Sequence, residues 1–120
     1  MGPESKLYQD LKKETCSIVW NRIENLSIVG MPDVLGYNTN HKFFTVELKV
    51  IKGNKIKFSP HQIAFHKTHP KNTFILVRTH GPCTMKLVPG SEALGAWRVD
   101  SVFFIADSWT GVQESFDQIF

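Results

Sequence analysis

The sequence of 120 residues lacks several features that mark whole classes of protein. Its two cysteines, Cys16 and Cys83, are too few and too isolated for a disulfide framework or for zinc-ligand spacing. No apolar run approaches the roughly 18 residues of a membrane span, and residues 1–10 are too polar for a signal peptide. These absences favour one domain over residues 1–120, cytoplasmic and away from membranes, with both thiols reduced.

Acidic residues are missing from one long segment. Residues 48–91 contain no aspartate or glutamate, but they contain seven lysines and Arg78, whereas the whole chain has a net charge of only +3. An uncompensated cationic segment is the electrostatic footprint expected of a protein that binds a polyanion. We therefore expect a polyanionic partner.

Residue patterning over the first two thirds of the chain predicts alternating helices and strands. Leu7 and Leu11 indicate a short amphipathic helix over residues 4–15, and the β-branched and aromatic residues 16–24 favour a strand. Ser59, Pro60 and Gln62 form a capping-box pattern that begins a helix ending before Pro70. Strands are expected at 30–35, 43–50, 73–78 and 84–88, and the helix over 59–69 connects two of them as a β-α-β crossover.

The last thirty residues are harder to interpret. Residues 91–94 favour a short helix that ends at Gly95, and the apolar run 102–105 fits either a strand or a buried helix. Val112, Phe116 and Phe120 recur every four residues and indicate a terminal helix over 110–120. That apolar stripe fits core packing or a dimer contact.

Two carboxylates meet in the hairpin predicted between the strands at 30–35 and 43–50. If its turn centres on Asn40, antiparallel pairing places Asp33 opposite Glu47, with Cβ atoms about 5 Å apart. Strand alternation puts Lys49 on the same face as Glu47. Two carboxylates this close repel each other unless a divalent cation lies between them.

Carboxylates and a lysine in this arrangement suit phosphodiester hydrolysis. Mg²⁺ or Mn²⁺ held by Asp33 and Glu47, with the Leu48 backbone carbonyl as a further ligand, can polarise water and neutralise charge on the phosphate. Lys49 can orient the attacking water or balance charge on the scissile phosphate. Glu47 and Lys49 alone would more commonly be an exposed ion pair, so the signal depends on the Pro32-Asp33 pair and the basic segment as well.

The pairing of Gly30-Met31-Pro32-Asp33 with Glu47-Leu48-Lys49 resembles the bipartite signature of the PD-(D/E)XK nuclease superfamily. The predicted order of elements is similar to the superfamily's restriction-endonuclease-like α-β-β-β-α-β core, a mixed sheet flanked by helices, here with a C-terminal helical and strand extension. Archaeal-type Holliday junction resolvases and small VRR-type nucleases resemble the chain most. The resemblance implies metal-dependent DNA cleavage with Asp33 and Glu47 as ligands and Lys49 as the catalytic lysine.

Further residues have roles implied by the same resemblance. Glu4, with Glu14 as the competitor, matches the glutamate of the first helix, and Gln62 matches a glutamine near the active site. Each has a structural alternative, because Glu4 also suits a helix N-terminus and Gln62 also completes a capping box. Candidate DNA contacts are Lys52, Lys55, Lys57, Lys67, Arg22 and Ser27.

We therefore expect a Mg²⁺-dependent endonuclease that acts on branched or structured DNA, resolvase-like and homodimeric. A chain of this size has little room for a separate sequence-reading domain, and the size is also compatible with a phage or mobile-element source. Alternatives within the enzyme class are a VRR-type nicking or flap nuclease and a compact restriction-type enzyme. An alternative of another class is a non-catalytic nucleic-acid-binding module on a nuclease fold.

Overall fold

A computed structural model describes residues 2–23, 30–80 and 83–120. Its elements, in chain order, are helix α1 (Pro3–Glu14), strands β1 (Val19–Arg22), β2 (Val34–Tyr37), β3 (Phe43–Lys52) and β4 (Lys55–Lys57), helix α2 (Pro60–Thr68), strands β5 (Thr73–His80) and β6 (Thr84–Pro89), the 3₁₀ helix η1 (Gly90–Glu92), strand β7 (Ala96–Arg98) and helix α3 (Trp109–Asp117). The predicted α-β-β-β-α-β order is present, with the short β4 inserted before α2. No described helix is long and apolar enough to cross a membrane.

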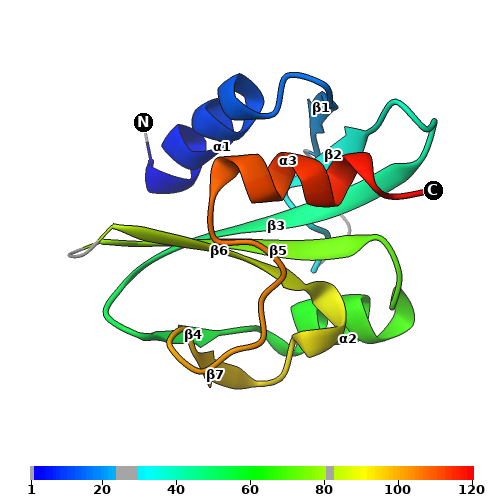
Figure 1. The fold of residues 1–120 in the computed structure, drawn as a ribbon. Coiled ribbons are helices and arrows are strands. Elements are labelled where there is room, and N and C mark those ends of the chain that lie inside the picture. The colour runs from blue at the N-terminus through cyan, green and yellow to red at the C-terminus, as the bar shows by residue number, and fades with distance from the viewer. Residues whose placement is uncertain (1, 24–29, 81–82) are drawn as a thin grey trace.

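The main sheet has five strands in the order β1-β2-β3-β5-β6. Strands β3 and β5 are parallel, as the predicted crossover through α2 requires, and the other neighbours are antiparallel. Helices α1 and α3 cover one face of this sheet, and α2 lies on the other face with the small β4–β7 sheet (Figure 1). The result is a mixed sheet flanked by helices, as predicted.

Two apolar clusters correspond to these two layers. Leu7 and Leu11 of α1 and Val112 and Phe116 of α3 pack against the buried side chains of β3 on one face. The second cluster fills the space between the other face and the β4–β7 sheet, and it contains Ile56, Phe58, Ile75, Val77, Val88, Ala93 and Val99. Val112 and Phe116 are fully buried within the chain, so they are core residues and only Phe120, 86% exposed, remains from the predicted apolar stripe.

The structure differs from the sequence-based expectations at several segments. Strand β2 begins at Val34, so residues 30–33, predicted as the start of that strand, lie before it. Strand β1 begins at Val19 because residues 16–17 turn after α1, where the Ile18 amide donates to the Thr15 carbonyl. The short helix predicted at 91–94 is the 3₁₀ turn η1. The run 102–105 is neither strand nor buried helix: Phe103, Phe104 and Ile105 are exposed, and only Ile105 and Ala106 bond to the β6 backbone, at Leu87.

Candidate metal centre

The register of the β2–β3 hairpin brings the predicted carboxylates together. Val34 pairs with Val46 and Leu35 with Thr45, which is the register of a turn centred on Asn40. Asp33 lies one residue before β2, and its Oδ2 accepts a 2.7 Å hydrogen bond from the Leu48 backbone amide. The opposition of Asp33 and Glu47 predicted from the sequence is therefore confirmed.

Glu47 is a buried acid with an unsatisfied oxygen. Its side chain is 4% exposed, and its Oε1 has no hydrogen-bond partner in the structure. Burial, and then the charge of Asp33, raise the pKa of Glu47 to about 9, while Lys49 opposes the shift. Burial and the neighbouring Asp33 therefore favour the protonated form of Glu47 in the metal-free protein.

Gln62 occupies both of the places that the sequence left as alternatives, in the capping box of α2 and beside Glu47. Its Oε1 accepts hydrogen bonds from the Ser59 backbone amide at 3.0 Å and from Lys49 Nζ at 3.2 Å. These two donors fix the orientation of the side-chain amide, so that Nε2 points to Glu47 Oε2 at 3.4 Å. The capping box of α2 thus joins Lys49 and Glu47 through one amide.

Two further neighbours support this arrangement: Phe58, which the sequence did not single out, and Gly30, which belongs to the signature quoted above. Lys49 Nζ lies 5.4 Å from the centroid of the Phe58 ring, which is part of the core beneath α2. Gly30 has φ +88°, and a Cβ atom at that position would lie 2.5 Å from the carbonyl oxygen of His61 in α2. Only glycine allows the chain to enter the site so close to the first turn of α2.

Glu4 is not part of the carboxylate pair. It lies exposed in the first turn of α1, and within the described ranges no three His, Cys, Asp or Glu side chains gather closely enough to hold a metal ion. Glu14, the alternative, is also exposed, in the last turn of α1. The structure therefore brings together Asp33, Glu47, Lys49 and Gln62 and leaves both α1 glutamates away from them.

The candidate DNA contacts are mostly exposed lysines. Lys52 ends β3, Lys55 and Lys57 belong to β4, and Lys67 lies in the last turn of α2. Arg22 is exposed on β1, with its guanidinium 5.5 Å from the Tyr8 ring centroid. Ser27 lies outside the described residues.

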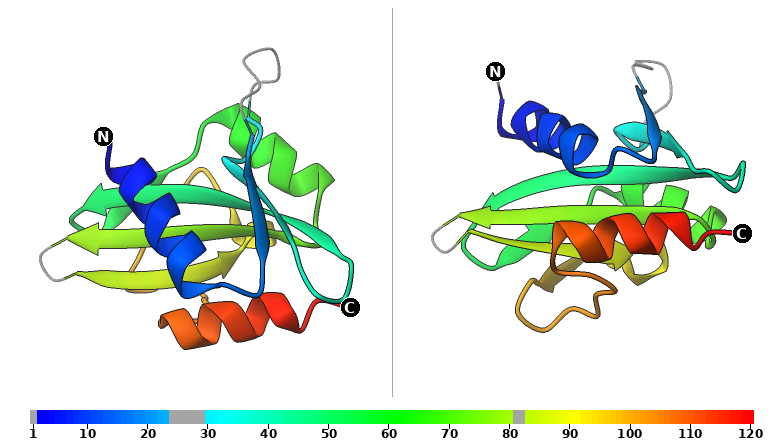
Figure 2. Two further views of the ribbon diagram at one scale, coloured as in Figure 1. Left: turned by 90° about the horizontal axis from the view of Figure 1, so that it is seen from above. Right: turned by 45° about the horizontal axis from the view of Figure 1, so that its top comes forward.

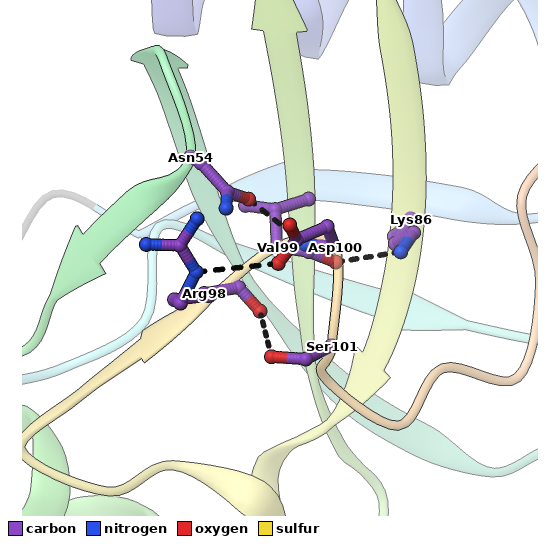
Figure 3. Close-up of polar contacts among 6 residues, drawn as sticks. All are labelled: Asn54, Lys86, Arg98, Val99, Asp100 and Ser101. Atoms are coloured by element: carbon purple, nitrogen blue, oxygen red, sulfur yellow. Dashed lines mark hydrogen bonds and ion pairs between the residues drawn. The ribbon is translucent and has the colours of Figure 1, made fainter.

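Part of the basic segment is used inside the protein. Arg78 forms a 2.8 Å ion pair with Asp10 of α1. Lys86 Nζ donates a 2.6 Å hydrogen bond to the Val99 carbonyl beside the turn where Asn54 meets Asp100 (Figure 3). The cationic surface is therefore smaller than the sequence count indicates.

Comparisons with known proteins show a likeness in fold. No protein-family model matches the chain, and no curated protein matches it. Among solved structures it is similar to Archaeoglobus fulgidus Hjc, a Holliday junction resolvase from an archaeal hyperthermophile, with a TM-score of 0.65 over 99% of each chain and 14% sequence identity. The chain therefore has the α/β fold of this resolvase, as the resemblance to PD-(D/E)XK nucleases predicts.

Proposed function

We propose that the protein is a Mg²⁺- or Mn²⁺-dependent endodeoxyribonuclease that hydrolyses phosphodiester bonds in branched or structured DNA. The observation that carries this proposal is the unpartnered, buried Oε1 of Glu47 beside Asp33. Two carboxylates and substrate oxygens suffice for Mg²⁺, which keeps several of its waters. The likeness of the fold to a Holliday junction resolvase supports the choice of substrate class.

In this proposal each residue has a distinct task. Asp33 and Glu47 would hold the cation, with the Leu48 carbonyl as a further oxygen ligand, and a bound cation would polarise a water and neutralise charge on the phosphate. Lys49, held by Gln62, places its ammonium where it balances charge on the scissile phosphate. The exposed Lys52, Lys55, Lys57, Lys67 and Arg22 contact the DNA backbone and position it without reading sequence.

The carboxylate pair is easier to explain by a catalytic role than by a contribution to the stability of the fold. Glu47 is buried without full hydrogen bonding, which destabilises a fold that has no ligand for it. A non-catalytic binding module has no physical reason to retain this arrangement. Glu4 is proposed only as an accessory residue, because it lies away from the pair.

Cleavage of a substrate panel tests the proposal. The purified protein is incubated with a four-way junction, a flap, a nicked duplex and a plasmid, with Mg²⁺, Mn²⁺ or EDTA. We expect metal-dependent cleavage that Asp33→Asn and Lys49→Ala each reduce by at least about 100-fold. Lys13→Ala, an exposed lysine on α1, is the matched control and should cleave as the wild type does.

Failure has two separable forms. If no substrate is cleaved with either metal, the enzyme proposal is wrong, and salt-sensitive DNA binding without product would support the binding module instead. Full activity of both variants would instead show that the site has been misplaced. We also propose a homodimer, which predicts paired symmetric nicks across a junction because two active sites are then related by a twofold axis.

A further inference from the structure

An exposed row of side chains crosses the first three strands at the hairpin end of the sheet. Val19 pairs with Tyr37, and Tyr37 pairs with Phe43. Val19 and Phe43 are each 59% exposed, and none of the three belongs to either apolar cluster. The row therefore has an apolar and aromatic surface that the fold does not use.

This row lies on the same face of the sheet as the candidate metal centre. Phe44, Val46 and Leu48 alternate along β3 and are buried in the cluster beneath α1 and α3. The intervening residues Phe43, Thr45, Glu47 and Lys49 consequently face the opposite side. Glu47 lies four positions after Phe43 along β3, a distance of about 13 Å in a strand.

The two aromatic rings form a compact unit. The centroids of Tyr37 and Phe43 are 4.5 Å apart, and the rings are inclined by 48°. The Tyr37 hydroxyl lies 3.1 Å from His41 Nδ1, which adds a polar edge.

The hairpin that carries the rings is fastened to the end of α3. Asn38, 2% exposed, donates from Nδ2 to the carbonyls of Phe116 and Ile119, at 2.9 and 2.8 Å. Asn40 Nδ2 donates to the carbonyls of Asp117 and Ile119. The C-terminus and the hairpin lie together in all views (Figures 1 and 2). The rings are thus held on a fixed support.

We propose that Tyr37 and Phe43 form a stacking platform for an unpaired base of the DNA strand whose phosphodiester lies at Asp33 and Glu47. The inference rests on the proposed function and narrows its substrate class to DNA with unpaired bases beside the branch. Exposed aromatic side chains bind single-stranded nucleic acid by stacking, because every base has a π-face. The platform lies on the same strand and the same face of the sheet as the proposed cleavage site, which places a base stacked on it near the strand held at Asp33 and Glu47.

Binding of a forked duplex with 2-aminopurine at the first unpaired position tests this inference, measured in EDTA so that no cleavage occurs. We expect wild-type protein to quench the 2-aminopurine fluorescence and to bind the fork more tightly than a fully paired duplex. Phe43→Ala and Phe43→Leu should each weaken fork binding by about tenfold. Phe43→Trp should retain both binding and quenching, and the affinity for the paired duplex should not change in any variant.

The matched control is Phe103→Ala, which removes an equally exposed phenylalanine, 60% against 59%, from another surface. Equal losses in the Phe103 and Phe43 variants would overturn the platform. So would unchanged fork binding in both Phe43 variants, or a Phe43 variant that changes the oligomeric state in sedimentation, since the row would then contact a second copy of the chain. Loss of cleavage in Asp33→Asn is scored separately, so the platform can fail while the nuclease proposal stands, and the reverse.

Discussion

At the scale of single residues, Glu47 has the most unusual environment in the described structure. Its carboxyl is buried, faces Asp33, and has one oxygen without a partner. The pKa of about 9, caused by burial and then by Asp33, means that a cation must displace a proton from Glu47 at neutral pH. Metal binding and proton release should therefore be linked.

Replacing Glu47 by glutamine should stabilise the metal-free protein in alkaline solution. In the unfolded chain Glu47 ionises near 4.5, whereas in the fold it keeps its proton to about 9. The folded state binds more protons between these values, so this residue lowers stability as pH rises through that window. We expect Glu47→Gln to gain up to about 5 kcal/mol at pH 8, at about 1.4 kcal/mol for each pH unit above 4.5, and little at pH 4.5.

Thermal denaturation in EDTA at pH 4.5 and 8 measures this gain. Glu14→Gln, which changes an exposed glutamate of α1, is the control and should show no such pH-dependent gain. A Glu47→Gln protein no more stable than wild type at pH 8 would contradict the environment described for Glu47.

A comparison of Ser59→Ala with Gln62→Ala should distinguish the helix-capping role of Gln62 from its positioning of Lys49. Ser59→Ala removes the hydrogen bond from the Gln62 backbone N–H to the Ser59 hydroxyl but leaves the Gln62 side chain in place. Gln62→Ala removes the contacts to Lys49 and Glu47 as well. Both variants should lose about 1 kcal/mol of stability, whereas only Gln62→Ala should lose roughly 10- to 100-fold in cleavage rate.

Steady-state kinetics and denaturation of both variants distinguish these effects. A fall in kcat with little change in KM is expected for Gln62→Ala, because a misplaced ammonium affects the reacting phosphate more than DNA binding. If Ser59→Ala loses as much activity, capping alone explains the role of Gln62.

At the scale of elements, local sequence patterns predicted the opposition of Asp33 and Glu47 and the start of α2. Some elements that depend on partners distant in sequence were not predicted. The hairpin register followed from the position of its turn, so the opposition of Asp33 and Glu47 was accessible from sequence. The start of α2 was equally local, because Ser59 and Gln62 are three residues apart. That Gln62 also reaches Lys49 required knowledge of how α2 packs on β3.

Other elements depend on partners distant in sequence. Strand β4 pairs with β7 through Lys55 and Arg98, a contact that no local pattern encodes. The apolar run 102–105 has the composition of a core strand, yet the second layer is already filled by residues such as Phe58 and Val88. For this reason Phe103, Phe104 and Ile105 remain exposed. Glu4 has the place in the sequence that the resemblance expects of the first-helix glutamate. Its distance from the carboxylate pair depends on the direction of α1, which the sequence does not reveal.

The fastening of the hairpin to α3 gives a prediction at this scale. Asn38→Ala removes two hydrogen bonds to the α3 end and the two that Asn38 Oδ1 accepts from the amides of Asn40 and Lys42. Loss of these bonds in a buried site should destabilise the protein by about 2–3 kcal/mol. Thr39→Ala, at the exposed neighbouring position, should cost less than about 0.5 kcal/mol. Urea denaturation compares the two variants, and equal stabilities would show that the hairpin is not fastened in this way.

At the scale of the whole molecule, stability depends on pH through two buried groups on opposite sides of neutrality. His66 of α2 is 1% exposed, and neither ring nitrogen has a hydrogen-bond partner. Burial, and then the charges of His69 and Lys49, lower the pKa of His66 below 6.5. The unfolded chain therefore binds more protons than the fold below pH 6.5, so His66 removes stability as pH falls, whereas Glu47 removes stability as pH rises.

His66→Leu should remove the loss of stability that His66 causes as pH falls. The variant has no titrating group at residue 66, so the difference in unfolding free energy between variant and wild type should shift in favour of the variant as pH falls from 7.5 to 5. Urea denaturation in EDTA at several pH values measures this difference, and comparison within each pH cancels the contribution of Glu47. His61→Leu, at an exposed position on the same helix, should show no such shift. A pH-independent difference for His66→Leu would contradict the environment described for His66, whose Nδ1 lies so close to Gly90 that a Cβ atom there would be 2.5 Å away.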